Sequence, residues 1–421
     1  MNPCIPDEDL RKFIKSIPKS DIHVHIDGSI RINTLFEIAK KDKIKLPYDS
    51  KEGLEKHLFL PKYKDLNEFL KAFKVLCSAL QSKENLERVS YEFAVDSYED
   101  HVHYVEARFC PQLHINPNMN MVEVLLSVDK GLKRATEEYN SKEAAKNGEI
   151  PSYNYCIIPS VMREIPKGLS WYYDNFIKIH EFSPIARISA IASYELVLAI
   201  IKIKKEYKLP IAGIDMAGRE IGFPPSIHKE TFNLAKKEGF HRTVHIEEEG
   251  APAIHEAISE CSAERIGIGM NLLDWKRIFD PKIKEPQKFV NWLINIIEEE
   301  QIVIEVCISR YLQTNPKLTT PNSLPIREML KHNLPVAICT DDRFLSKTCL
   351  SQELEIAYKS FKLTLKELKD IIFTSFNGMF YNGKHKEKIE FIQKCREYYD
   401  KLENGLLNKL QNNSSNSQLK K

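Results

Sequence analysis

Two histidines near the N-terminus, His23 and His25, have a spacing suited to metal chemistry. They lie in the stretch Ser-Asp-Ile-His-Val-His-Ile-Asp-Gly-Ser at residues 20–29. Hydrophobic and polar residues alternate here, which predicts a short strand with both imidazoles on one face. Gly28 and Ser29 are expected to end the strand, and Ser29 is the expected N-cap of the next helix. Ligand sites of α/β proteins form at such strand ends, so the two imidazoles can converge on one metal ion there.

A second histidine pair with the same spacing, His101 and His103, provides an internal comparison. A lone His-x-His pair is more often structural than functional. This second pair opens its predicted strand, at the end opposite to the one where α/β sites form. We therefore interpret His101 and His103 as structural residues.

Three further strand ends carry residues that can complete a metal site. One closes with His245, followed three residues later by Glu248; another closes with Asp341 and Asp342; a third closes with the segment 215–218, Asp-Met-Ala-Gly. Three histidines and one carboxylate suit a catalytic zinc ion that keeps a position open for water. Zinc lowers the pKa of that water toward neutrality, and Glu248 is the natural proton carrier beside it.

Strand-like segments alternate with longer helical ones along most of the chain. After the first strand, we expect strands at 103–109, 153–160, 211–216, 242–246, 264–269, 302–307 and 336–340. Helical stretches between them include 122–139, 193–205, 228–238, 287–299 and 326–331. Eight such units predict an α/β fold, a (β/α)₈ TIM barrel, with extra helices after the first strand and at the C-terminus.

The overall composition narrows the class of protein. The chain has 421 residues, of which 43% are hydrophobic and 29% charged, with a net charge of +2. These values are typical of a globular protein and give no reason to expect nucleic acid or a membrane as partner. Nine cysteines without a Cys-x-x-Cys motif indicate reduced thiols, and no signal peptide is recognisable. We therefore expect a cytoplasmic protein.

The chain is expected to form a single domain. Residues 1–403 are assigned to one metal-dependent barrel. Residues 404–421 are rich in Asn, Ser, Gln and Lys. Because such a segment has few apolar side chains to bury, we predict that it is a disordered polar tail.

Four motifs in order along the chain resemble those of the adenosine deaminases, in the metal-dependent amidohydrolase superfamily. They read His-Val-His-Ile-Asp-Gly-Ser, Asp-Met-Ala-Gly, His-Arg-Thr-Val-His-x-x-Glu and Cys-Thr-Asp-Asp. The resemblance runs from about residue 17 to residue 381. It implies one zinc ion per chain, held by His23, His25, His245 and Asp341. It also implies hydrolytic deamination of adenosine or 2'-deoxyadenosine, in purine salvage, by a chain that we expect to be a monomer.

The resemblance further implies a role for individual residues in binding a small purine nucleoside. Glu248 gives a proton to purine N1 while zinc hydroxide attacks C6, with Asp341 the second catalytic residue. Asp342 bonds N7, Gly218 bonds N3 and Asp27 bonds the ribose hydroxyl. The substrate-contacting residues implied in this way are His25, Asp27, Leu66, Phe69, Leu70, Phe73, Gly218 and Asp342. The four hydrophobic residues of this set also have the spacing of a packed amphipathic helix, and the resemblance implies that Phe69, Leu70 and Phe73 form a lid over the ribose.

Several positions depart from the family pattern. Ile268 stands where the family has a histidine, and an isoleucine side chain can neither donate nor accept a proton. Glu247 replaces a glycine, the segment 307–311 replaces a Cys-Pro-x-Ser-Asn pattern, and Arg343 stands where proline is usual. Losing one preorganised electrostatic group typically costs about 10²–10³ in rate.

Two hypotheses follow from these departures. In the first, the protein is a working deaminase of adenosine or of a modified purine nucleoside. In the second, it has lost catalysis and binds zinc or a nucleoside. All four metal ligands and Glu248 are kept, which favours the enzyme.

Overall fold

Eight parallel strands form one sheet at the centre of the computed structural model, which describes residues 5–418, with side chains through residue 412. The strands are β1 (Lys19–His25), β2 (Val102–Phe109), β3 (Asn154–Met162), β4 (Gly213–Ala217), β5 (His241–Ile246), β6 (Arg265–Ile268), β7 (Val303–Val306) and β8 (Val336–Ile338). Each strand pairs with the next in sequence. A backbone bridge between Val24 and Asp341 joins the segment after β8 to β1. The predicted (β/α)₈ barrel is therefore confirmed.

The predicted strands agree with the observed ones to within one or two residues at each end. The agreement has a physical cause. Helices cover the outside of the barrel, so that strands such as β1 and β2 are buried along their whole length. Strands buried on both faces have long apolar runs, which are easy to recognise in a sequence.

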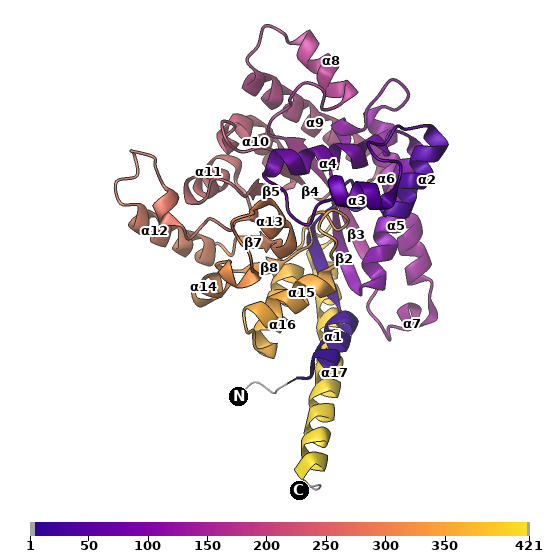
Figure 1. Ribbon diagram of the computed structural model, residues 1–421, viewed down its shortest axis with the longest axis vertical. Coiled ribbons are helices and arrows are strands. Elements are labelled where there is room, and N and C mark those ends of the chain that lie inside the picture. Colours follow the sequence, from indigo (N-terminus) through magenta and orange to yellow (C-terminus); the bar gives the residue numbers. More distant parts are fainter. Residues whose placement is uncertain (1–4, 419–421) are drawn as a thin grey trace.

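Helices surround the barrel on all sides (Figure 1). Four of them, between β1 and β2, are the extra helices that the sequence predicts after the first strand: α2 (Ile32–Asp42), α3 (Lys51–His57), α4 (Leu66–Ser78) and α5 (Lys83–Glu99). The outer layer continues with α6 (Met121–Asn140), α7 (Glu143–Lys146), α8 (Trp171–Ile179), α9 (Ile185–Tyr207), α10 (Lys229–Lys237), α11 (Ala251–Cys261), α12 (Pro286–Glu299), α13 (Ile308–Thr314) and α14 (Ile326–Lys331). Helices α1 (Asp7–Ser16), α15 (Leu350–Ser360), α16 (Leu365–Gly378) and α17 (His385–Gln418) come from the two ends of the chain. None of the helices within residues 5–418 is both long enough and apolar enough to cross a membrane.

The barrel interior holds a network of fully buried ion pairs. The guanidinium groups of Arg108 and Arg265 each lie 2.7 Å from Glu305 Oε1, and Arg265 also pairs with Glu106. A buried charge is tolerated only where an opposite charge and hydrogen bonds compensate it. The network therefore fixes the orientation of these side chains, and of Glu305 in particular.

The start of α2 differs from the prediction that Ser29 is its N-cap. The helix begins at Ile32, after Arg31 in an extended conformation. The Ser29 hydroxyl instead donates a hydrogen bond to the carbonyl oxygen of His25 at 2.5 Å. Ser29 thus closes the turn after β1 and contributes nothing to the helix end.

The predicted disordered tail also differs from the structure, because α17 continues as a helix through Gln418 (Figure 1). Leu406 is buried, and Leu407 and Leu410 pack against the hydrophobic core. Lys409 forms an ion pair of 2.6 Å with Asp9 of α1. These few apolar contacts are enough to order a segment whose average composition is polar. Residues 419–421 of the predicted tail lie outside the described residues.

Candidate active site

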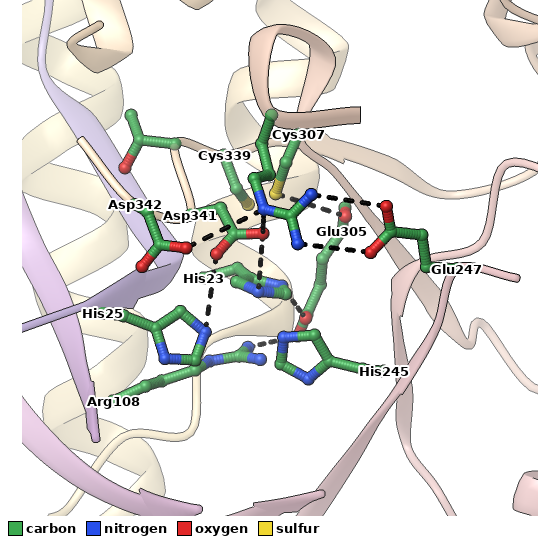
Figure 2. A network of polar contacts seen from close by, with 12 residues as sticks. His23, His25, Arg108, His245, Glu247, Glu305, Cys307, Cys339, Asp341 and Asp342 are labelled. Atoms are coloured by element: carbon green, nitrogen blue, oxygen red, sulfur yellow. Dashed lines mark hydrogen bonds and ion pairs between the residues drawn. The ribbon is translucent and has the colours of Figure 1, made fainter. Parts of the chain in front are cut away.

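Three histidines meet at the carboxyl ends of β1 and β5. Each residue contributes one ring nitrogen, and these nitrogens of His23, His25 and His245 all lie within 4.8 Å of one another (Figure 2). His23 Nδ1 lies 2.8 Å from Glu305 Oε2, and His245 Nδ1 lies 2.9 Å from Asp215 Oδ1. These carboxylates fix each ring so that Nε2 is the nitrogen left for a metal. His23 Nε2 is buried and has no hydrogen-bond partner among the described residues.

Asp341 approaches the same point from the end of β8. Its carboxylate oxygens lie 3.8 Å from His23 Nε2 and 3.6 Å from His25 Nε2. The residue has a φ of 60°, a left-handed conformation that non-glycine residues rarely adopt and that concentrates at functional sites. Cys307 also lies near His23 and Asp341, and burial raises the pKa of its thiol well above 9.0, which disfavours the thiolate that a metal would bind. The donor set of three imidazoles and one carboxylate fits zinc.

The surroundings of the rings favour the neutral imidazole, the form that metals bind, at His23 and His25 but not at His245. Burial lowers the pKa of His23 well below 6.5, and Arg108 lowers it further. Burial also acts to lower the pKa of His245, but the adjacent Asp215 outweighs it and the net change is upward. Asp342 differs from its neighbour Asp341: burial, and then repulsion from Asp341, raise its pKa well above 3.8. The raised pKa favours the protonated form of Asp342, in which the carboxyl group can donate a hydrogen bond.

A cavity of about 700 Å³ opens directly above the cluster. All eight residues predicted to contact substrate line it: His25, Asp27, Leu66, Phe69, Leu70, Phe73, Gly218 and Asp342. The four hydrophobic ones come from α4, which therefore covers the cavity. One carboxylate oxygen each of Asp27 and Asp342 is buried without a hydrogen-bond partner in residues 5–412. Unpaired buried oxygens of this kind are costly unless a ligand meets them.

Gly28 is required where β1 leaves the cavity. A Cβ atom at this position would lie 1.6 Å from Asp342 Oδ1, which is far inside van der Waals contact. Only glycine lets the turn after β1 approach the Asp342 carboxylate so closely.

The structure does not bring Glu248, the predicted proton carrier, to the cavity lining. Its carboxylate accepts a hydrogen bond from the backbone nitrogen of Glu220 at 3.3 Å, and Glu247 lines the cavity instead. The cause is a long-range contact. The Glu220 carboxylate accepts hydrogen bonds from the backbone nitrogens of residues 247, 248 and 249, and so sets the course of the loop after β5.

Two side chains near the histidines had not been singled out from the sequence. Glu305 contacts His23, and its signal was a charged residue inside an apolar strand, Val-Ile-Glu-Val in β7. Asp215, which contacts His245, belongs to the segment 215–218 that the sequence had placed at a strand end of the site. Arg310 of α13 also lines the cavity, where it pairs with Glu247. Its only signal was the departure of segment 307–311 from the family pattern.

Comparison with known proteins agrees with this geometry. The sequence profile of the family described as adenosine deaminase matches residues 18–145 and 177–394. An adenosine deaminase of Clostridium botulinum (strain 657) is 28% identical over 378 residues, covering 89% of this chain and 98% of the relative. One from Clostridium perfringens (strain ATCC 13124) is 29% identical over 377 residues, covering 89% and 97%.

Solved structures share the fold at lower sequence identity. An amidohydrolase from Burkholderia ambifaria with bound zinc superposes with a TM-score of 0.73 at 18% identity, covering 96% of each chain. An adenine deaminase from Arthrobacter aurescens gives 0.70 at 19% identity, with coverage of 91% and 100%. An N6-methyl-AMP deaminase from Arabidopsis thaliana gives 0.67 at 20% identity, with coverage of 93% and 98%. With the profile matching most of its length, the chain belongs to the adenosine deaminase family and is a hydrolytic deaminase.

Proposed function

We propose that this protein is a zinc-dependent deaminase that converts adenosine or 2'-deoxyadenosine to the corresponding inosine nucleoside and ammonia. The observation that carries the proposal is the convergence of His23, His25, His245 and Asp341, with outer carboxylates fixing two of the rings. One zinc ion held by these four residues would make hydroxide available as a nucleophile at neutral pH. The family membership and the zinc-containing structural relative support this assignment.

The cavity residues support a nucleoside in a defined orientation. We propose that protonated Asp342 donates a hydrogen bond to purine N7 and that Gly218 bonds N3. The unpaired oxygen of Asp27 accepts a hydrogen bond from a ribose hydroxyl, and the α4 side chains Phe69 and Phe73 cover the sugar. In the reaction, a water oxygen bonds to C6, the C6–N bond breaks, and the amine leaves as ammonia with a proton from water.

Two neighbouring carboxylates compete for the role of proton carrier at N1. Both oxygens of Glu247 are occupied, by Arg310 at 3.3 Å each and by the Thr314 hydroxyl at 2.6 Å. Glu248 accepts a single long hydrogen bond and is only partly buried. We therefore assign proton transfer to Glu248, a role that requires its carboxylate to turn from the Glu220 amide toward the cavity.

A second candidate function, binding of zinc or a nucleoside without turnover, is favoured by one observation. Ile268 at the end of β6 is fully buried and has no polar atom in its side chain. Its φ of 69° is an outlier for a β-branched residue. The backbone thus keeps a costly conformation of the kind found at functional sites, although the side chain it presents has no chemistry.

A substrate panel tests the proposal. Ammonia release is measured with adenosine, 2'-deoxyadenosine, adenine, AMP and N6-methyl-AMP, because solved relatives act on adenine and on N6-methyl-AMP. We expect kcat/KM to be highest for a nucleoside, and Asp27→Asn to weaken nucleoside turnover while leaving zinc bound. A preference for free adenine or for a monophosphate would contradict the assignment of Asp27 to the ribose.

The state of the cysteines bears on the cellular compartment of the protein. All cysteines within the described residues are unpaired, which supports a reducing compartment such as the cytoplasm. We propose that the enzyme acts there as a monomer on a freely diffusing small molecule.

A further inference from the structure

Arg310 is held rigidly at the wall of the cavity. Its Nη1 and Nη2 atoms lie 3.3 Å from the two carboxylate oxygens of Glu247, and Nη1 donates to the Thr314 hydroxyl at 2.8 Å. The guanidinium carbon lies 3.9 Å from the centre of the Phe69 ring, within the range of a cation–π contact. The side chain is only 6% exposed. A guanidinium with this many contacts has one orientation.

The remaining nitrogen of Arg310 is aimed at the catalytic carboxylates. Nε lies 3.8 Å from Asp341 Oδ2 and 3.8 Å from Asp342 Oδ2. These separations are too long for hydrogen bonds, and Nε is buried without a hydrogen-bond partner in the described part of the chain. One N–H group therefore remains available between the metal-binding carboxylate and the carboxyl group assigned to the purine.

Glu247 and Arg310 compensate each other. Either charge alone would be expensive to bury in this cavity, but the two-pronged pair neutralises both. Figure 2 shows Glu247 and Asp342 on opposite sides of the cluster. The Arg310 guanidinium pairs with Glu247 and lies 3.8 Å from Asp342, so it spans the site between them. Both residues depart from the family pattern that the sequence resembles, and in this chain they contact each other.

We propose that Arg310 supplies the electrostatic group that the end of β6 lacks, where Ile268 can donate no hydrogen bond. Its Nε–H donates to the attacking water as negative charge develops on that oxygen, and its fixed charge positions the carboxylate of Asp341. Arg310 is thus a further catalytic residue, and Glu247 is its positioning residue. The proposal rests on the deaminase function proposed above. A preorganised cation in a site that excludes water is among the strongest means of stabilising a transition state.

The test compares four purified variants with the wild type. Arg310→Gln removes the positive charge. It also leaves the buried Glu247 carboxylate unpaired, which can destabilise the fold. The double variant Arg310→Gln with Glu247→Gln removes that unpaired charge, so that a loss of kcat in it is not caused by unfolding. Arg310→Lys keeps the charge without the planar fork. Arg343→Gln is the matched control, because Arg343 also stacks on a phenylalanine, Phe93, and pairs with a buried carboxylate, Asp21, outside the cavity. The measurements are kcat and KM for adenosine, zinc per chain, and the Kd of inosine.

We expect kcat to fall by about 10²–10³ in both the single and the double glutamine variants, with KM, inosine Kd and zinc content changed less than about threefold. Arg310→Lys should recover part of the lost kcat, and Arg343→Gln should retain kcat within about threefold whatever its thermal stability.

Three results would overturn the proposal. An unchanged or increased kcat in the double variant would show that Arg310 is dispensable or obstructs the cavity. Loss of zinc in that variant would make Arg310 a support of the metal site instead of a catalytic group. Absence of turnover by the zinc-loaded wild type would overturn the deaminase function as well, so the wild-type assay separates the two failures.

Discussion

The two sides of the cavity are built on different principles. On the side of β1, β5 and β8, two of the three imidazoles are oriented by a carboxylate behind the ring, His23 by Glu305 and His245 by Asp215. On the side of α13, a charged pair of Arg310 and Glu247 is held by mutual contact and by an aromatic ring. The first side depends on residues at the ends of strands. The second depends on a pair whose two members, Glu247 and Arg310, compensate each other's buried charge.

The largest loss of activity is expected when one of the proposed zinc ligands is removed. His23→Ala removes a ligand whose Nε2 has no other partner among the described residues, so zinc should be lost and kcat should fall by at least about a thousandfold. His103→Ala is the control, because His103 belongs to a second His-x-His pair, which lies at the opposite end of the barrel. Zinc content and ammonia release are measured together. Loss of zinc from the folded His103 variant would contradict the interpretation of that pair as structural.

Glu248→Gln separates the two carboxylates that follow β5. Loss of a proton carrier should reduce kcat by about 10²–10⁴ while zinc stays bound. Glu247→Gln, which keeps a neutral acceptor beside Arg310, should reduce kcat less. The comparison of the two kcat values is the measurement. If the order is reversed, Glu247 is the proton carrier and the pairing with Arg310 must open during turnover.

Glu220 holds the loop after β5, which lies between the two sides of the cavity. Replacing Glu220 should change the free energy of unfolding and its dependence on pH. Burial raises its pKa from 4.5 to about 7. The folded protein therefore binds this proton more tightly than the unfolded chain, so the associated stability is complete below pH 4.5 and is lost as the pH rises through 7. The loss is roughly 3 kcal/mol. Urea unfolding at several pH values should show this decline in the wild type and its absence in Glu220→Gln; equal slopes would contradict it.

The smallest effect is expected from Asp215, which contacts a proposed zinc ligand, His245, and not the metal itself. Asp215→Asn keeps the size of the side chain but removes the charge that orients His245. Zinc affinity should fall by about 10–100-fold, with the fold unchanged. Competition with a chelator gives the affinity. An unchanged affinity would mean that the carbonyl oxygen of Met216, 3.1 Å from the same nitrogen, is sufficient to orient the ring.

The sequence predicted the fold because the fold follows from local pattern, and the histidines that it proposed as metal ligands lie close together in the structure. Apolar runs identified the strands, and position at a strand's end distinguished His23 and His25 from His101 and His103. The structure supports the distinction, since His103 is buried near the start of β2 and burial lowers its pKa to about 3.

Non-local contacts limited what could be predicted elsewhere. The direction of Glu248 is set by Glu220, and no spacing within the loop reveals that contact. The place of Arg310 depends on its approach to Glu247 from another strand end. The order of the C-terminal segment depends on side chains such as Leu406 meeting the core. Each is a tertiary contact that local composition does not encode.

The most direct test of the account is ammonia release from adenosine by the purified, zinc-loaded protein, with metal content determined on the same sample. The account predicts turnover with about one zinc ion per chain, which would show that a site without a histidine on β6 is catalytic. One bound zinc ion per chain without ammonia release from any purine nucleoside would contradict it, and would establish a binding protein in place of an enzyme.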